Sequence, residues 1–513
     1  MLQIQSLNMH HTRNHQQLIE EANFVINPGD RVALIGAEGT GKSSLLRWIY
    51  NPSLTPEYIN ITGQMKNDFG KMAYLPQVMD AETLQSTIDD YLFNPDDAAT
   101  TDFNLLFQAA QTLDFDVNAL DGGLKMSQLS GGQQIKLQLV KLMASDPDFY
   151  LLDEPSNNLD FATQKWLIHF IKTTPATFLY VSHDEHLLQE TATKVIHLEQ
   201  VHHKTKPRFT TKQANYQAYV DERRERFTKD TQIANKQVQE YKGLKKKNNE
   251  IQQSVDHQLE ITKDVSVGRM LAKKMKNLKS QEKRFDREKG NFTEKPLADD
   301  LINIEFNRTK PLDNKLLLSL YQYELNEPVP HLIQNIHFNF HSHDKVGFYG
   351  ENGVGKTSLL AVLYNMLSQR EDIQLGYMPQ NYQDQFDMEQ TAIDFLTVVG
   401  DKEEHTLIMT VLGSSLFTVE EMQQPIKRLS GGQQAKLFLL KMSMEGSNVI
   451  LLDEPTRNFS PLSQGELRTM FQEFTGGIIA ISHDLLFMEA VCDKIYEVTS
   501  NGLLEHKNNQ FSN

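Results

Sequence analysis

The chain contains one set of short motifs twice, in the same order and at nearly constant spacing. The recurring pairs are RVALIGAEGTGKSSLL (31–46) with KVGFYGENGVGKTSLL (345–360), YLPQ (74–77) with YMPQ (377–380), LSGGQQIKLQL (129–139) with LSGGQQAKLFL (429–439), YLLDEPS (150–156) with ILLDEPT (450–456), and VSHD (181–184) with ISHD (481–484). Such repetition indicates a duplicated domain. The segment near 210–300 has no counterpart, so we predict two copies of one domain joined by an inserted segment.

Each copy is predicted to be an α/β domain. Short apolar runs such as RVALIG, FYLLD and TFLYVS, matched by KVGFYG, VILLD and GIIAIS, end in glycine or polar residues. Runs of this kind suit buried strands of a largely parallel sheet that carries functional residues at its carboxyl edge. We therefore predict a first domain over 1–212, a linker over 213–300 and a second domain over 301–513.

Charge is divided unevenly along the chain. The net charge is −16, which argues against nonspecific nucleic-acid binding by the whole surface, yet Lys and Arg outnumber acidic residues between 221 and 290. The single cysteine, Cys492, allows no internal disulfide. No signal peptide and no apolar run long enough to span a bilayer is evident. We expect a soluble cytoplasmic protein.

Two glycine-rich loops carry the clearest chemical signal. Gly36-x-x-x-x-Gly41-Lys42-Ser43 and Gly350-x-x-x-x-Gly355-Lys356-Thr357 each follow a predicted strand and precede a helical pattern. Glycines let backbone N–H groups surround phosphates, the lysine reaches the β- and γ-phosphates, and the hydroxyl can ligate Mg²⁺. A glycine-rich turn without a ligand could explain one match but not two.

A carboxylate pair follows a predicted apolar strand in each copy. Asp153 and Asp453 end these strands, where they can hold the Mg²⁺ shell, and Glu154 and Glu454 can polarise the attacking water. Phosphoryl transfer depends mainly on such positioning and charge neutralisation. We predict ATP hydrolysis with Mg²⁺ as the metal.

The motifs together resemble those of ATP-binding-cassette proteins, over almost all of 1–210 and 315–513. Ser130-Gly131-Gly132-Gln133 and Ser430-Gly431-Gly432-Gln433 look like that family's signature, and Gln77, Gln380, His183 and His483 complete its set. The resemblance implies head-to-tail pairing of two cassettes within a monomer, with each ATP between the phosphate loop of one and the signature of the other. It also implies that the glutamines contact metal or water and the histidines sense the γ-phosphate.

The site residues predicted on these grounds fall into three groups. The catalytic group is Glu154, Glu454, His183 and His483; the ATP contacts are Gly36, Gly39, Gly41, Lys42, Ser43, Ser44, Gln77, Ser130, Gly131, Gly132, Gln133, Gly350, Asn352, Gly353, Gly355, Lys356, Thr357, Ser358, Gln380, Ser430, Gly431, Gly432 and Gln433; the Mg²⁺ ligands are Ser43, Gln77, Asp153, Thr357, Gln380 and Asp453. The residues that stack on adenine are left open, with Tyr321 or Tyr323 as candidates.

The segment between the copies shows apolar stripes at coiled-coil spacing. They consist of Val220, Phe227, Ala234, Val238 and Tyr241, then Leu271, Met275, Leu278 and Phe285, with an interruption around 245–262. We predict two long helices folded into an antiparallel hairpin. A solvated spacer is the alternative. Clustered lysines favour contact with ribosomal RNA: Lys245, Lys246, Lys247, Lys273, Lys274, Lys276 and Lys279.

Tandem cassettes joined by a charged helical hairpin resemble the ABC-F proteins, which are translation factors and ribosome-protection proteins. The resemblance implies ribosome binding at the tRNA exit site in the ATP-bound form, contact with ribosomal RNA and exit-site tRNA, and no membrane partner. The stretch from Asp453 to Pro461 looks like the antibiotic-resistance subgroup, whereas Asp153 to Asp160 is closer to the housekeeping pattern. We therefore expect protection of the peptidyl-transferase centre from antibiotics, with release on ATP hydrolysis.

Three other functions remain as alternatives. A housekeeping translation factor is the nearest. An ATPase subunit of a membrane transporter fits the cassette motifs but rarely carries a basic rod between cassettes. A DNA-repair or chromosome ATPase also uses coiled coils, but these usually interrupt a single cassette.

The two phosphate loops differ at one position. Glu38 replaces the asparagine usual in the family and present at Asn352, and Ser460 stands where the first copy has Asp160. In the pairing that the resemblance implies, both departures fall at one composite ATP site. We expect Glu38 to weaken nucleotide binding there unless a cation offsets it, with Arg457 as the candidate across the interface.

Overall fold

The computed structural model describes residues 1–12, 15–93, 103–113, 115, 123–157, 159–201, 206–261, 264–289, 302, 304–326, 332–382 and 387–506. The chain divides into two compact units. One unit consists of 1–216 and 299–513 and contains both cassettes; the other, 217–298, contains the linker. The predicted domain ends at 300 and 301 lie outside the described residues.

The first cassette is built on a six-stranded sheet in the order β5-β6-β7-β3-β8-β9. Its strands are β3 (Arg31–Gly36), β5 (Met72–Leu75), β6 (Phe149–Asp153), β7 (Thr177–Val181), β8 (Lys194–Val201) and β9 (Lys206–Lys212). Pairing is parallel except between β8 and β9. An antiparallel sheet of β2 (Gln17–Ile26), β1 (Leu2–His11) and β4 (Ile59–Asn67) adds to it, and its side chains share one apolar core with β3, β6, β7 and β8.

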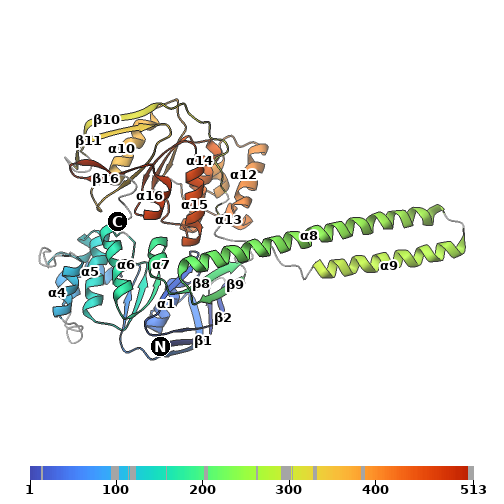
Figure 1. Cartoon of the computed structure of the whole chain (residues 1–513), viewed down its shortest axis with the longest axis horizontal. Helices are drawn as coiled ribbons and strands as arrows, with labels where there is room; N and C mark the ends of the chain where they lie inside the picture. The colour runs from blue at the N-terminus through green and yellow to red at the C-terminus, as the bar shows by residue number, and fades with distance from the viewer. Residues whose placement is uncertain are drawn as a thin grey trace. The chain divides into compact units, whose positions relative to one another are not determined.

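The second cassette repeats this plan. Its sheet has the order β13-β14-β15-β12-β16-β17, with β12 (Lys345–Tyr349), β13 (Leu375–Met378), β14 (Val449–Asp453), β15 (Gly477–Ile481), β16 (Lys494–Thr499) and β17 (Gly502–His506). Only β16 and β17 pair antiparallel in it. The hairpin of β10 (Leu316–Leu325) and β11 (Ile333–His341) packs against it. The prediction of two α/β cassettes is confirmed (Figure 1).

Helices cover both sheets. In the first cassette they are α1 (Lys42–Tyr50), α2 (Ala81–Gln85), α3 (Ile88–Leu92), α4 (Phe103–Thr112), α5 (Gly131–Ala144), α6 (Phe161–Thr173) and α7 (Glu185–Thr191). In the second they are α10 (Lys356–Ser368), α11 (Ala392–Leu396), α12 (Lys402–Ser414), α13 (Val419–Gln423), α14 (Gly431–Glu445), α15 (Pro461–Glu473) and α16 (Leu485–Val491). None of the described helices is long and apolar enough to cross a bilayer.

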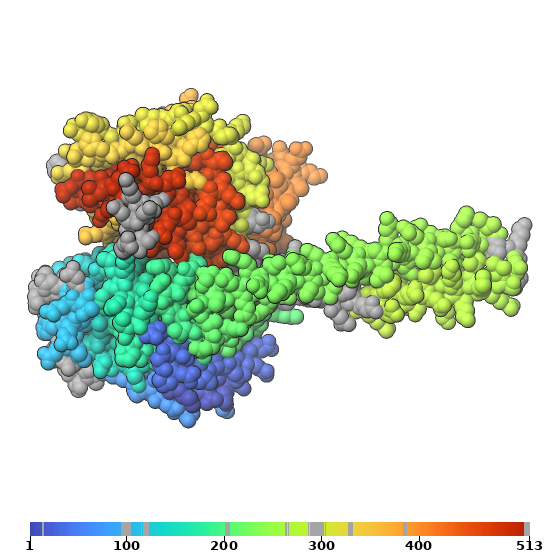
Figure 2. Space-filling model, in the orientation of Figure 1, coloured from blue at the N-terminus to red at the C-terminus, as the bar shows by residue number. Residues whose placement is uncertain are grey.

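The linker forms a helical hairpin of α8 (Tyr216–Ile261) and α9 (Val265–Lys289), which lie side by side in Figures 1 and 2. A small core of Val255, Leu271 and Leu278 joins them. The side-chain amide of Asn248 also donates to the carbonyl oxygen of Leu278 at 3.4 Å. The antiparallel hairpin was predicted correctly.

The interruption of the apolar stripe around 245–262 does not interrupt the helix. α8 continues to Ile261 and α9 begins at Val265; Thr262 lies outside the described residues. Lys, Gln and Glu are good helix formers, and no proline interrupts them. Val255 packs on α9 within the same stretch, so tertiary contacts stabilise a helix that lacks a regular apolar stripe.

Candidate functional site

The two phosphate loops have the same geometry. Each leads from a buried strand to a helix whose N-cap is a left-handed glycine, Gly41 at φ 91° and Gly355 at φ 103°. A side chain at either position would be strained. Lys42 Nζ donates to the carbonyl oxygens of Gly36 (2.8 Å) and Ala37 (2.9 Å). Lys356 Nζ makes the equivalent contacts within its own loop, both at 2.9 Å.

An aspartate closes the buried strand beside each loop. Ser43 Oγ donates to Asp153 Oδ1 at 3.0 Å, and the Thr357 hydroxyl likewise bonds Asp453. Burial raises the pKa of Asp153 to about 6 and that of Asp453 to about 7. In both, Oδ2 is buried without a hydrogen-bond partner among the described residues. An orphaned carboxylate oxygen next to a hydroxyl is a donor set that fits Mg²⁺.

The glutamates that follow adopt a strained backbone. Glu154 has φ 55° and Glu454 has φ 53°, a region that non-glycine residues rarely occupy. Each backbone N–H donates at 2.9 Å to the last residue of the neighbouring strand, Val181 or Ile481. Burial raises the pKa of Glu454 to about 7. The same strain in both copies indicates that the fold fixes the direction of these carboxylates.

A histidine pairs with each glutamate. The His183 backbone N–H donates to Glu154 Oε2 at 3.0 Å, and the His483 N–H donates to Glu454 Oε2 at 3.2 Å. The ring Nε2 lies 3.2 Å from Glu154 Oε1 in the first copy and 3.7 Å from Glu454 Oε1 in the second. Glu154 Oε1 makes no hydrogen bond within the described residues. Burial lowers the pKa of His483 to about 4, so this imidazole is neutral at physiological pH.

Each signature motif begins a helix. Ser130 caps α5 and Ser430 caps α14, in both cases through a capping box with the glutamine three residues on. The helices therefore present the glycine N–H groups of their first turn, which suits binding of an anion. Within the described residues, no hydrogen bond joins Ser130–Gln133 to the second phosphate loop.

The first phosphate loop and the second signature line one cavity. Its volume is about 360 Å³, and its lining includes Ala37, Glu38, Gly39 and Thr40 from the first cassette, and Glu421, Arg428, Ser430, Gly432, Gln433, Lys436, Asn458, Phe459 and Ser460 from the second. Loop and signature thus meet head to tail on this side. A cavity of about 350 Å³ borders the second loop, lined by Asn352, Gly353, Gly355, Lys356, Thr357, Ser358, Gln380, Asp453, Glu454 and His483.

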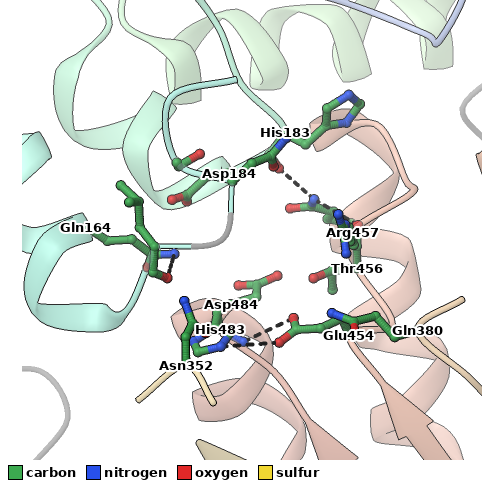
Figure 3. A pocket seen from close by; sticks show the side chains of 14 residues that line it. Gln164, His183, Asp184, Asn352, Gln380, Glu454, Thr456, Arg457, His483 and Asp484 are labelled. Atoms are coloured by element: carbon green, nitrogen blue, oxygen red, sulfur yellow. Dashed lines mark hydrogen bonds and ion pairs between the residues drawn. The ribbon is translucent and has the colours of Figure 1, made fainter. Parts of the chain in front are cut away.

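A smaller cavity of about 120 Å³ also takes residues from both cassettes (Figure 3). Glu454, His483 and Gln380 of the second cassette face Gln164 and Asp184 of the first. Gln77, the counterpart of Gln380, follows β5 and is exposed.

Arg457, the candidate cation for Glu38, forms no ion pair with it within the described residues. Glu38 Oε2 instead accepts a hydrogen bond of 2.7 Å from the backbone N–H of Gly431. Arg457 lines the smaller cavity, beside Glu454 and Thr456. The two tyrosines considered for stacking on adenine have different surroundings. Tyr321 is 76% exposed, whereas Tyr323 packs on the apolar core.

Several cross-cassette contacts involve residues that the motif analysis did not select. His183 Nδ1–H donates to the Phe459 carbonyl oxygen at 3.0 Å, and Gln464 Nε2 donates to the His183 carbonyl oxygen at 2.7 Å. Arg468 Nη1 lies 2.7 Å from Glu185 Oε2, and both side chains are mostly buried. Arg468 corresponds to Ile168 in the first copy, and Glu185 corresponds to Leu485 in the second. The sequence signal that could have identified this ion pair is therefore a difference between the two copies.

Comparison with known proteins agrees with this geometry. The family model described as ABC transporter matches residues 19–157 and 333–457. The putative ATP-binding protein YdiF of Bacillus subtilis is 28% identical over 75% of this chain and 57% of YdiF, so the match spans little more than half of that relative. The ribosome protection protein VmlR of Bacillus subtilis is 27% identical over 96% of this chain and 86% of VmlR.

A solved structure supports the fold. The archaeal ribosome recycling factor aABCE1, in complex with the ribosomal stalk protein aP1, superimposes with a TM-score of 0.61 over 98% of this chain and 90% of that protein, at 15% identity.

Proposed function

We propose that this chain, which belongs to the ABC transporter family of ATP-hydrolysing cassettes, is an ABC-F-type ATPase that binds the ribosome in its ATP-bound form. The observation that carries this proposal is the joining of two paired cassettes to a helical hairpin that forms a unit of its own. The hairpin lies between the two copies of the cassette and has no counterpart within them.

The ATP chemistry follows from the repeated geometry. Lys42 and Lys356 hold the phosphates, and the glutamates Glu154 and Glu454 orient the attacking water. Ser43, Asp153 and Gln77 in one cassette, with Thr357, Asp453 and Gln380 in the other, would hold Mg²⁺, which neutralises phosphate charge when bound. The histidines keep each glutamate in place through the backbone N–H contacts at 3.0 and 3.2 Å.

The hairpin supplies a surface for RNA. Of the seven predicted lysine contacts, Lys245 is half-buried beside Tyr241, and the other six are exposed on α8 and α9. Exposed lysines on a rigid helical pair suit the phosphates of structured RNA. The names of two similar proteins, a ribosome protection protein and a ribosome recycling factor, support a ribosomal partner. We further propose that the protein acts as a monomer in the cytoplasm and enters the ribosome at the tRNA exit site.

Ribosome binding is tested with the double variant Glu154→Gln, Glu454→Gln. It should bind ATP, hydrolyse it slowly and co-sediment with ribosomes, because the phosphate loops are unchanged. A matched control adds Lys42→Ala and Lys356→Ala to this variant and should lose both ATP and ribosomes. If the double variant binds ATP but stays in the supernatant, the ribosome is not the partner.

The antibiotic-resistance function rests on the Thr456–Pro461 stretch combined with the long linker. Expression in a sensitive bacterial host should raise the inhibitory concentration of drugs that act at the peptidyl-transferase centre, and of no unrelated class. An unchanged response to every ribosomal drug would favour the housekeeping alternative, to which the Asp153–Asp160 stretch is closer.

The role of the hairpin is tested by removing the part of α8 that packs on α9. Replacing 245–262 with a short glycine-serine turn should abolish protection and leave ATP hydrolysis nearly unchanged, because the phosphate chemistry lies in the cassettes. A second variant carries Lys273→Gln, Lys274→Gln, Lys276→Gln and Lys279→Gln, which remove charge from α9 and keep the length of the hairpin. Protection that survives the replacement of 245–262 would make the hairpin a spacer.

A further inference from the structure

The first phosphate loop places a carboxylate on the second signature helix. Glu38 Oε2 accepts the Gly431 backbone N–H at 2.7 Å, a length typical of a charge-assisted hydrogen bond. Gly431 is the first residue of α14, a helix of 15 residues whose cap is Ser430. The contact therefore joins the tip of one cassette's loop to the N-terminus of the other cassette's signature helix.

The N-terminus of a helix binds anions for a physical reason. Its first N–H groups lack partners within the helix, and the aligned peptide dipoles add partial positive charge. A phosphate group and a carboxylate both satisfy these donors. In the proposed pairing, the γ-phosphate of an ATP held by Lys42 reaches this same turn, so Glu38 and the nucleotide need the same N–H group.

Two side chains approach Gly431 closely. A Cβ at this position would lie 3.3 Å from Glu38 Oε2 and 3.2 Å from Asn458 Oδ1, so glycine permits the close approach. Asn458 itself is held by its side-chain amide, which donates to Tyr382 Oη at 2.8 Å. A side chain at residue 431 would therefore interfere with the contact of Glu38.

The charged residues around the cavity would allow ATP to replace Glu38 at Gly431. Arg428 and Lys436 line it along with Glu38 and Glu421, and Lys436 is only 8% exposed. These cations attract an entering triphosphate, while the carboxylate of Glu38 repels it. The second loop carries Asn352 at the matching position, which has no charge, and the described lining of its cavity includes none of Ser130–Gln133.

We propose that Glu38 is an internal competitor of the γ-phosphate at the second signature, so that ATP binds the composite site of Lys42 and Ser430 only by displacing it. This inference rests on the proposed ATP roles of the two loops. Because ATP must displace Glu38, this composite site binds ATP more weakly than the other. Glu38 therefore sets the order in which the two sites bind ATP.

The experiment measures each site separately in the Glu154→Gln, Glu454→Gln background. Adding Lys356→Ala leaves the composite site of the first loop, and adding Lys42→Ala leaves that of the second. ATP affinity is then measured with a fluorescent ATP analogue. Glu38→Asn, which copies the second loop, should tighten binding at the first site by about tenfold, since removing one like charge beside a phosphate has an effect of roughly this size.

The reciprocal variant provides the matched control. Asn352→Glu should weaken binding at the second site, and Glu38→Asn should leave that site unchanged. Unaltered or weaker binding at the first site in Glu38→Asn, with an unchanged thermal midpoint, overturns the inference. Loss of ATP binding by both single-site parents would instead count against the proposed roles of the loops themselves.

Discussion

His183 and His483 have the same relation to Glu154 and Glu454 but different partners across the interface. His183 Nδ1–H donates to the Phe459 carbonyl oxygen of the other cassette at 3.0 Å. His483 Nδ1 is buried without a hydrogen-bond partner among the described residues, and its ring lies 5.9 Å from that of Phe161. The two copies therefore share the same histidine–glutamate geometry within each cassette but not the same hydrogen bonds between cassettes.

This difference has a structural origin. Within a cassette, strand ends and backbone hydrogen bonds fix the glutamate and the histidine, and these depend little on side-chain identity. Between cassettes the contacts are made by single side chains, such as Gln464 and Arg468 on α15. A substitution there changes one contact and leaves the fold intact. The cross-cassette contacts are therefore where the two ATP sites can become unequal.

The largest expected effect separates the two glutamates. Glu454→Gln alone should lower ATP turnover at its own site by about a hundredfold, the usual contribution of a group that activates a water, so that the remaining turnover comes from the first site. At limiting ATP, Glu154→Gln should lower it less, because its site has Glu38 as a competitor. Phosphate release at several ATP concentrations measures both. Equal losses at every concentration would mean that the two copies work alike.

The ion pair between Glu185 and Arg468 gives the next effect. Arg468→Ile, which installs the residue of the first copy, leaves Glu185 buried without its partner and should lower stability by about 2 kcal/mol. Glu185→Leu, which installs the residue of the second copy, removes the partner of Arg468 in the same way. Their combination should be more stable than either single variant, as measured by thermal unfolding. Additive losses would show that the two side chains do not interact.

A smaller effect is expected at the buried aspartates. Asp453→Asn removes a carboxylate whose pKa is raised by burial, so the nucleotide-free protein should gain about 1 kcal/mol while losing ATPase activity. Asp153→Asn should gain less, because the pKa of Asp153 is raised less. Melting temperatures without nucleotide test the order. A loss of stability in both variants would mean that these carboxylates contribute to stability.

The smallest effect compares two helix caps. Asp160 accepts a hydrogen bond of 2.8 Å from the Thr163 N–H and caps α6, whereas Ser460 makes no side-chain cap for α15. Ser460→Asp should stabilise the second cassette by about 0.5 kcal/mol, and Asp160→Ala should destabilise the first by about 1 kcal/mol. Thermal unfolding of the two variants measures this. A destabilising Ser460→Asp would place its new charge too near Glu38.

Some of this organisation was predictable from sequence, and some was not. The phosphate loops and the carboxylates at strand ends belong to local patterns, so the two cassettes could be located residue by residue. The partner of Glu38 depended on which group lies within reach across an interface, and local sequence does not contain that information. The interrupted apolar stripe at 245–261 does not reveal that α8 continues through this stretch, because the packing on Leu271 and Leu278 lies outside the segment itself.

The presence of both cassettes in one chain has a consequence for how such a protein can diverge. In a dimer of identical subunits every interface residue occurs twice, so a change at one site is imposed on its symmetry mate. Here residue 38 and residue 352 are inherited separately. Covalent fusion has thus removed the twofold constraint, and each half of the interface can acquire mutations of its own without a matching change in the other.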